Sequence, residues 1–336
     1  MYFIVFTGGE KNPLFDTLMK DANIPGRSEV TGVIPHIPER RSKLWKFHHK
    51  RGLNRKAPAP FKGIWGKYAT DAEEKIAKAA AEHPDEGVGL IFSNLAMVYY
   101  EAATLKRWKD RYKVKLFLYL VDKHDSVYAA DAINAAGLGI FDKVFTFSHD
   151  DAERFGFEFF DCYYSKPQSE DVPTKKDALE TDPFESDAFF WGTDGGRREH
   201  AESIYRQLTD AGLKVSMGIC YTEITGKEIP GITYNEPIPY EELIRRAKGS
   251  RCLIDLTGYY SGGVSLRYFE AIAFGKKLLS DNKLVKEMRL FDSTQILVPG
   301  DVNDIGADMI DMIRKETTPI EYKGEFSPVH LLDMCE

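Results

Sequence analysis

Long apolar runs are missing from this sequence. Its most apolar stretches, such as residues 115–121, are far shorter than the roughly 20 residues that a helix needs to cross a bilayer. The first residues also lack the basic start, the apolar stretch and the small-residue cleavage site of a secretory signal. The sequence therefore predicts neither a membrane-spanning protein nor a secreted one.

Cysteine is scarce. The four cysteines include no pair with the C-x-x-C spacing of a zinc site or a dithiol motif. Cys220 and Cys252 lie in or at the end of apolar runs, where we expect buried thiols. The H-x-x-x-H pattern is absent too, so we expect no metal site. Free thiols indicate a reducing, cytoplasmic compartment.

Positive charge is in the minority. The chain has 45 lysines and arginines against 52 aspartates and glutamates, which gives a net charge of −7. This balance argues against a general nucleic-acid-binding protein, and we expect no nucleic-acid partner. Hydrophobic residues make up 43% of the sequence and recur in compact clusters, which excludes an intrinsically disordered chain. The length of 336 residues is enough for two domains.

Short apolar runs alternate with amphipathic stretches along the chain. The runs are continuous rather than alternating, as expected for parallel strands covered on both faces. We expect strands at residues 2–7, 29–35, 87–93, 114–121, 143–147, 188–192, 214–219, 232–234, 252–256, 277–280 and 295–298. We expect helices near residues 13–22, 68–82, 95–112, 126–136, 198–211, 240–248, 264–274, 284–290 and 302–315. This order predicts an α/β protein with doubly wound, Rossmann-like sheets.

A charged stretch with three prolines, residues 166–185, interrupts the alternation. It indicates a linker between two domains. We expect domains at residues 1–165 and 187–318, a linker at 166–186, and a tail at 319–336 that could return to the N-terminal domain. Two such domains facing each other leave a central cleft at the carboxyl ends of their strands, where ligands of these sheets bind.

The most informative segment follows an expected strand in the second half. Gly262 and Gly263 lie in a glycine-rich loop, and a helix is expected to start near Ser265. Glycines let the backbone approach a ligand closely, and the free N–H groups of a helix start suit a diphosphate. Arg267 could add a charge-assisted contact, and Glu270 could accept hydrogen bonds from the hydroxyls of a ribose. A flexible loop before an ordinary amphipathic helix fits the pattern equally well.

The same segment resembles the donor-site signature of glycosyltransferases with the GT-B fold. The resemblance rests on residues 265–282, which contain the run Phe-Glu-Ala-Ile-Ala-Phe-Gly, and more loosely on the two-domain layout. It implies that Glu270 contacts the ribose of a nucleotide sugar, and that Gly262, Gly263 and Ser265 line its diphosphate. Retaining members carry a second glutamate eight positions earlier, where this chain has Gly262, so an inverting enzyme is implied. The likeness is greatest to bacterial transferases of capsule, exopolysaccharide and lipopolysaccharide assembly, and it implies that bound metal is dispensable.

A second loop, Trp-Gly-Thr-Asp-Gly-Gly-Arg-Arg at residues 191–198, opens the C-terminal domain. In the enzymes that it resembles, this loop faces the diphosphate. Arg197 is therefore a candidate phosphate clamp and Gly192 a point of close approach, although a turn with solvated arginines is the alternative. Tyr234 or Tyr240 could stack on the nucleobase, but such tyrosines are often simply half-buried at a domain edge.

Two titratable residues follow a buried strand of the N-terminal half, Asp122 and His124. An inverting transferase needs a general base that takes the proton of the acceptor hydroxyl. Asp122 is the first candidate for this catalytic role and His124 the second. A structural acceptor for backbone amides is the alternative for Asp122. Gly8 and Gly9, after the first strand, could admit a ligand or form only a tight turn.

Residues 40–67 form a basic and aromatic segment with ten lysines and arginines and no acidic residue. Such a segment suits adsorption to an anionic membrane surface, which would bring the protein to a lipid-linked acceptor. It could instead bind nucleic acid or an acceptor pyrophosphate, or be a solvated loop. The residues expected in this membrane or acceptor patch are Arg40, Arg41, Lys43, Trp45, Lys46, Lys50 and Arg51.

Together these features predict a metal-independent glycosyltransferase of the hexosyltransferase type in bacterial surface polysaccharide synthesis. We expect it in the cytoplasm, peripheral to the inner face of the plasma membrane. The N-terminal domain would bind a lipid-linked or oligosaccharide acceptor. The C-terminal domain would bind a nucleotide-diphosphate sugar, a UDP-sugar above all, and no cofactor is expected. Two alternatives remain open: a nucleotide-sugar epimerase on the same fold, and a catalytically silent, membrane-attached binding subunit of a polysaccharide assembly complex.

Overall fold

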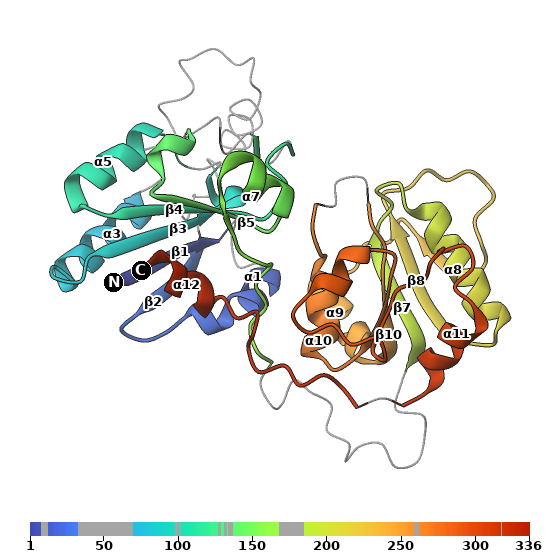
Figure 1. Ribbon diagram of the computed structural model, residues 1–336. Coiled ribbons are helices and arrows are strands. Elements are labelled where there is room, and N and C mark those ends of the chain that lie inside the picture. Colours follow the sequence, from blue (N-terminus) through green and yellow to red (C-terminus); the bar gives the residue numbers. More distant parts are fainter. Residues whose placement is uncertain are drawn as a thin grey trace. The chain divides into compact units, whose positions relative to one another are not determined.

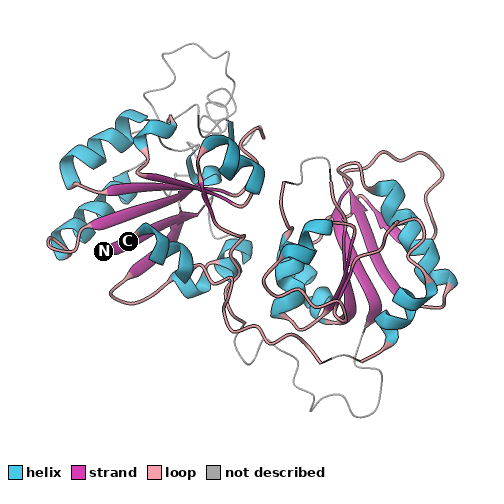
Figure 2. Ribbon diagram, viewed as in Figure 1, coloured by secondary structure: helices cyan, strands magenta, loops and turns pink. Residues whose placement is uncertain are grey.

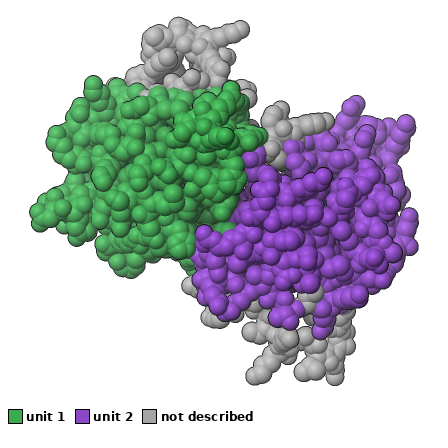
Figure 3. Space-filling view, viewed as in Figure 1, with its two compact units in different colours: residues 1–165, 326–336 green, residues 166–325 purple. Residues whose placement is uncertain are grey.

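The computed structural model describes residues 1–7, 13–32, 70–97, 100, 102–126, 129–130, 133, 137–167, 185–258, 262–316 and 318–336. The chain folds into two compact units (Figure 3). Unit 1 consists of Met1–Ser165 with Phe326–Glu336, and unit 2 of Lys166–Glu325. Each unit has a parallel sheet and a hydrophobic core of its own, so the prediction of doubly wound α/β domains is confirmed.

Unit 1 contains a six-stranded parallel sheet in the order β2-β1-β3-β4-β5-β6, with helices against its faces (Figure 2). Its strands are β1 (Tyr2–Thr7), β2 (Ser28–Gly32), β3 (Val88–Ser93), β4 (Lys115–Leu120), β5 (Lys143–Thr146) and β6 (Glu158–Phe159). The helices that the structure describes with both ends in this unit are α1 (Pro13–Leu18), η1 (Lys20–Ala22), α3 (Thr70–Glu82), α4 (Asn94–Met97), α5 (Ala102–Tyr112), η3 (Leu138–Ile140), α7 (His149–Phe155) and α12 (Val329–Cys335). Every residue of β3 is buried, as its continuous apolar run requires.

The C-terminal segment Phe326–Glu336 belongs to unit 1, where α12 lies beside the N-terminal strands (Figure 1). The hydroxyl of Ser327 donates to Asp21 Oδ2 at 3.0 Å, and Arg27 forms ion pairs with Asp333 and Glu336. The residues before this segment stay with unit 2, since the amide of Ile320 donates to Gln295 Oε1 at 2.7 Å.

Unit 2 repeats the architecture with the strand order β12-β11-β10-β7-β8-β9, and all strands are parallel. Its strands are β7 (Ser186–Thr193), β8 (Val215–Cys220), β9 (Ile232–Tyr234), β10 (Ser250–Asp255), β11 (Lys277–Ser280) and β12 (Ile296–Leu297). Its helices are α8 (Arg198–Asp210), α9 (Tyr240–Lys248), α10 (Leu266–Ala273), η5 (Lys283–Glu287) and α11 (Ala307–Arg314).

Several elements differ from the sequence-based expectation. The helix expected at 302–315 begins only at Ala307, because Asp301 and Asp304 form an isolated bridge and Gly306 takes a φ of 78°. The helix expected at 284–290 is the short 3-10 helix η5. The strand β6 was not expected, because a strand of two residues is too short to give a periodic hydrophobic pattern.

Among the helices that the structure describes, none has the length and apolarity to span a bilayer.

Candidate functional site

The carboxyl edge of the unit 2 sheet changes direction between β7 and β10. The chain leaves β7 toward β8 on one side and leaves β10 toward β11 on the other, so the two loops diverge at this point. Such a switch point is where doubly wound sheets bind ligands. The loops approach each other closely, since a Cβ placed on Gly258 would lie 3.4 Å from the carbonyl oxygen of Gly195. The sequence-predicted donor residues other than Tyr234 lie on or beside these loops and the start of α10.

Arg197 joins the two loops. Its Nε donates to the carbonyl oxygen of Thr193 at 2.8 Å, and its Nη1 donates to that of Leu256 at 2.6 Å. The guanidinium also lies 5.5 Å from the ring centroid of Phe190. Burial lowers the pKa of Arg197, an effect opposed chiefly by the charge of Asp255. Part of this arginine's donor capacity therefore holds the site together, and its role as a phosphate clamp stays a prediction.

Asp194 fixes the loop after β7. Its Oδ1 accepts hydrogen bonds from the amides of Gly196 at 3.0 Å and Arg198 at 3.3 Å, where α8 begins. Its Oδ2 accepts one from the hydroxyl of Thr222 at 2.6 Å. Gly195 and Gly196 take φ angles of 50° and 83°, which a glycine adopts without strain. Because Asp194 occupies these amides, they are not free to bind an anion.

The start of α10 is held by a buried carboxylate, Asp255, at the end of β10. Ser265 caps the helix: its Oγ accepts a hydrogen bond from the amide of Arg267 at 3.1 Å and donates one to Asp255 Oδ1 at 2.6 Å. The hydroxyl of Ser280 donates to Asp255 Oδ2 at 2.8 Å. Sequence reasoning missed Asp255, although an acidic residue inside an apolar strand is a signal that could have found it.

Asn282 fixes the end of the glycine-rich loop. The side chain of Asn282 donates to the carbonyl oxygen of Gly263 at 2.9 Å, and its own amide donates to the hydroxyl of Ser280 at 3.1 Å. Gly262 and Gly263 are half-buried, and residues 259–261 lie outside the described residues. The loop end that meets α10 is thus fixed from β11 as well as from β10.

Glu270 lies one turn into α10 and is 2% exposed. Its Oε2 pairs with Arg267 Nη1 at 2.5 Å, and the hydroxyl of Tyr240 donates to its Oε1 at 3.3 Å. Burial raises the pKa of Glu270, and the charge of Arg267 opposes this effect. The guanidinium of Arg267 lies 5.6 Å from the ring centroid of Phe189. The predicted residues Arg267, Glu270 and Tyr240 therefore form one polar cluster.

The two arginines lie within electrostatic reach of each other, because the charge of Arg267 lowers the pKa of Arg197. Asp281, after β11, supplies negative charge nearby and raises that pKa. Its Oδ1 accepts hydrogen bonds from the amide and hydroxyl of Thr257 at 2.7 and 2.6 Å. His200 Nδ1 lies 3.9 Å from Asp281 Oδ2. The switch point thus combines two guanidiniums with carboxylates that are tied to the backbone.

Tyr234 is engaged within unit 2. Its hydroxyl donates to Glu202 Oε1 at 2.9 Å and accepts from the amide of Ile229 at 3.1 Å. The guanidinium of Arg198 lies 5.0 Å from the centroid of its ring. Stacking of Tyr234 on a nucleobase stays a prediction.

Gly192 lies beside Arg197, since a Cβ on Gly192 would come within 3.2 Å of Arg197 Nη2.

The predicted bases Asp122 and His124 lie in unit 1, after β4. The side-chain amide of Asn94, which is 0% exposed, donates to Asp122 Oδ2 at 2.9 Å and accepts from the amide of Val121 at 2.8 Å. His124 stacks on Phe155 with ring centroids 3.9 Å apart. The carboxylate of Asp122 is therefore oriented by Asn94, which follows the neighbouring strand β3, as expected for a general base. Its catalytic role stays a prediction.

Other predicted residues fall outside the description. The membrane or acceptor patch within residues 40–67, and Gly8 and Gly9, lie outside the described residues. In the described part of the chain, no group of three or more His, Cys, Asp and Glu side chains is placed to hold a metal ion.

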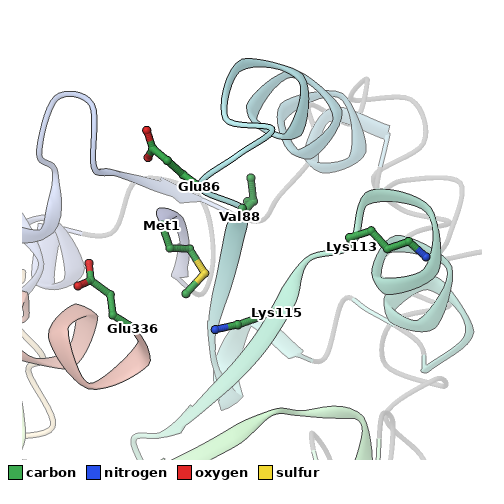
Figure 4. A pocket seen from close by; sticks show the side chains of 7 residues that line it. Met1, Glu86, Val88, Lys113, Lys115 and Glu336 are labelled. Atoms are coloured by element: carbon green, nitrogen blue, oxygen red, sulfur yellow. The ribbon is translucent and has the colours of Figure 1, made fainter.

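Two cavities lie away from these residues. One, of about 290 Å³, lies at the amino ends of β3 and β4 and is lined by Val88 and Lys115 among others (Figure 4). The other, of about 370 Å³, lies at the amino ends of β7 and β8 and includes Ser186 and Val215 in its lining. Both lie at the amino ends of parallel strands, the opposite edge from the candidate site, and neither is lined by a predicted site residue.

Replacing Asp255 by asparagine is expected to make folding less sensitive to rising pH. Burial raises the pKa of Asp255, so the folded state favours the neutral carboxyl and loses stability as the pH rises through the raised pKa. Asparagine cannot ionise, so the variant's melting temperature should fall less than that of the wild type between about pH 4 and about pH 8. Thermal unfolding measures this difference, with the exposed Asp308→Asn as control, and equal falls in all three proteins would contradict it.

The known proteins that are similar to this chain are found among solved structures. No protein-family model matches the sequence, and no curated protein matches it. An α-glucosyltransferase in complex with UDP and a 13-mer DNA is similar, with a TM-score of 0.55, 13% identity, and coverage of 93% of this chain and 89% of that one. An α-glucosyltransferase with UDP-glucose and DNA containing an abasic site has a TM-score of 0.50, 14% identity, and the same coverage of 93% and 89%. A candidate UDP-N-acetylglucosamine 2-epimerase from Listeria monocytogenes has a TM-score of 0.50, 12% identity, and coverage of 99% and 94%.

At these identities the likeness concerns the fold and nothing finer. It extends over nearly the whole chain in each case and includes both parallel sheets. The chain therefore has the GT-B fold, as its sequence predicted.

Proposed function

We propose that the protein is a glycosyltransferase that uses a nucleoside-diphosphate sugar, with UDP-sugars favoured. The observation that carries the proposal is the switch point of unit 2, where Arg197, Arg267 and the start of α10 come together with Glu270. Guanidiniums and helix N–H groups are the donors that suit a diphosphate. A carboxylate one turn further suits the paired hydroxyls of a ribose.

The solved structures give this proposal independent support. The similar α-glucosyltransferases are described as complexes with UDP and with UDP-glucose. The likeness in fold supports the proposal by analogy, and the site residues named above supply its chemical basis.

The proposed reaction is a single displacement with inversion. The bond between the anomeric carbon and the diphosphate oxygen breaks while a bond from the acceptor oxygen to that carbon forms. Asp122 takes the proton of the acceptor hydroxyl, and the nucleoside diphosphate leaves with the electron pair of the broken bond. Arg197, Arg267 and the positive end of the α10 helix dipole stabilise the negative charge that develops on the leaving group.

For the acceptor we propose a lipid-linked saccharide at an anionic membrane surface, on the inner face of the plasma membrane. The basic and aromatic composition of residues 40–67 supports this choice. DNA is the second candidate acceptor, because the similar α-glucosyltransferases are described in complex with it. Incubation of a UDP-sugar with anionic vesicles carrying a lipid-linked saccharide, or with duplex DNA, distinguishes the two by the product that gains the sugar.

A nucleotide-sugar epimerase is the second candidate function. The similarity to the candidate 2-epimerase from Listeria monocytogenes favours it. An epimerase needs no acceptor, so incubation with UDP-N-acetylglucosamine alone, followed by chromatography, would yield a new UDP-sugar. Glycosyl transfer requires the acceptor and releases UDP. Nucleotide binding without either product would favour a silent binding subunit.

Replacing Glu270 is expected to weaken nucleotide binding by roughly ten- to a hundredfold, because hydrogen bonds to a charged group are lost. Calorimetry with UDP, GDP, dTDP and CMP measures the effect. Glu270→Gln preserves the volume of the side chain and separates lost charge from lost packing. Glu287→Ala, which changes an exposed glutamate of the same unit, is the matched control. Wild-type affinity in Glu270→Gln and Glu270→Ala would remove the ribose role, and a folded wild type that binds no nucleotide would overturn the proposed function.

A further inference from the structure

Tyr221 has an unusual backbone conformation. It follows β8 at the carboxyl edge of the unit 2 sheet and has a φ of 58°. Within the described residues, only Lys113 and Asn235 share a positive φ without being glycine. Aromatic residues are rarely found in this left-handed region, and strained residues of this kind cluster at functional sites.

Packing does not explain the strain. Tyr221 is 77% exposed, more than any other large hydrophobic residue in the described part of the chain. Ile224, on the same loop, is 59% exposed. An asparagine or a glycine at position 221 would adopt the conformation more readily, and the exposed ring contributes no core contacts in return.

The residues on both sides of Tyr221 are firmly held. The amide of Thr222 donates to Asn235 Oδ1 at 2.9 Å, and Asn235 Nδ2 donates back to the carbonyl oxygen of Thr222 at 2.8 Å. The hydroxyl of Thr222 donates to Asp194 at 2.6 Å, and the carbonyl oxygen of Cys220 accepts from the amide of Asp194 at 2.8 Å. Asp194 is the residue that fixes the loop after β7, so the position of Tyr221 is tied to the candidate site.

Two other tyrosines among the described residues of unit 2, Tyr234 and Tyr240, have hydrogen-bond partners. The hydroxyl of Tyr234 donates to Glu202 and its ring lies beside Arg198, while the hydroxyl of Tyr240 donates to Glu270. Tyr221 instead presents an exposed ring. The strand register pairs Cys220 with Thr193, so Tyr221 lies next to the loop that follows β7. This loop contains Gly195 and Gly196, which have no side chains that could cover the ring.

We propose that Tyr221 is a stacking residue for a flat ring of the ligand bound at the unit 2 switch point. This inference rests on the proposed function, because that function supplies a ligand with such rings. A phenol ring can stack on the π face of a nucleobase or on the apolar C–H face of a pyranose. The two rings belong to one nucleotide sugar, and the experiment distinguishes them.

The test compares affinity and stability in Tyr221→Asn. Asparagine tolerates the left-handed conformation, so we expect a melting temperature equal to or above that of the wild type. The ring is lost, so calorimetry should show roughly tenfold weaker binding. UDP and UDP-glucose are the two probes, or the corresponding pair for whichever nucleoside diphosphate the wild type binds. Tyr221→Phe keeps the ring and should bind as the wild type does, and Ile224→Ala controls for an altered loop surface.

Each outcome is decisive. Weaker binding of UDP and UDP-glucose alike supports stacking on the base, and weaker binding of UDP-glucose alone supports stacking on the sugar. Unchanged affinity for both probes in Tyr221→Asn overturns the inference. If Tyr221→Asn melts at a lower temperature, Tyr221→Gly repeats the measurement with a residue that needs no strain. A wild type that binds neither probe contradicts the proposed function instead, so the two failures are distinguishable.

Discussion

An Arg267→Ala variant is expected to lose about 3 kcal/mol or more of its free energy of unfolding, because it leaves a buried carboxylate without its cation. Glu270 is 2% exposed, and Arg267 pairs directly with it. Urea denaturation monitored by fluorescence measures the loss. Without the arginine, the raised pKa of Glu270 would rise further, so the neutral carboxyl would be favoured at low pH. The loss should therefore be smaller at about pH 5 than at about pH 8.

Two further variants separate the ion pair from its individual charges. Combining Arg267→Met with Glu270→Met removes both charges and should restore most of the stability, because no buried charge is left unpaired. Arg314→Ala removes the arginine of an exposed pair with Asp311, together with its hydrogen bond to the carbonyl oxygen of Ala211, and should change stability by about 1 kcal/mol. If Arg267→Ala falls in the range of Arg314→Ala, the pair does not hold a buried charge as the structure describes.

A buried ion pair of this kind contributes little net stability to the folded state. Apolar residues of similar volume often serve the folded state as well or better. The presence of Arg267 and Glu270 in α10, beside Arg197, therefore calls for another reason. The proposed ligand would supply one, because a nucleoside-diphosphate sugar presents phosphates to a cation and hydroxyls to a carboxylate at adjacent positions.

The sequence predicted the fold for identifiable reasons. Strands β3 and β10 are buried along most of their length, so their apolar runs were continuous and easy to recognise. The start of α10 was predicted near Ser265, and Ser265 is its N-cap residue. The grouping of Arg267, Glu270 and Tyr240 follows from the doubly wound topology, which brings α9 and α10 to the same carboxyl edge.

Other features depend on contacts that sequence patterns do not encode. The link from Arg197 to the carbonyl oxygen of Leu256 joins residues that are distant in sequence, so only the folded sheet shows it. Asp255 holds Ser265 and Ser280 in the same way. The conformation of Tyr221 could not be expected, because tyrosine has no preference for positive φ. The backbone beside it is held by the hydrogen bonds of Thr222 with Asp194 and with Asn235, which follows β9.

An Asp122→Asn variant is expected to lower kcat by about a hundred- to ten-thousandfold while leaving nucleotide affinity unchanged. The amide cannot accept the proton of the acceptor hydroxyl. Its oxygen can still accept the hydrogen bond from Asn94, which lies 2.9 Å from Asp122 Oδ2, so the local geometry should persist. The release of UDP from a UDP-sugar, in the presence of whichever acceptor supports transfer, measures kcat. Calorimetry with UDP measures the affinity.

The second candidate base provides the control. His124 stacks on Phe155, and its Nδ1 lies 3.1 Å from Asp125 Oδ1, so its ring already has partners on its own loop. His124→Gln should reduce kcat only slightly if Asp122 is the base. A collapse of turnover in His124→Gln with activity retained in Asp122→Asn would reverse the assignment. Asn94→Ala adds a graded test, because removing the amide that orients Asp122 should lower kcat less than removing the carboxylate itself, with UDP affinity again unchanged.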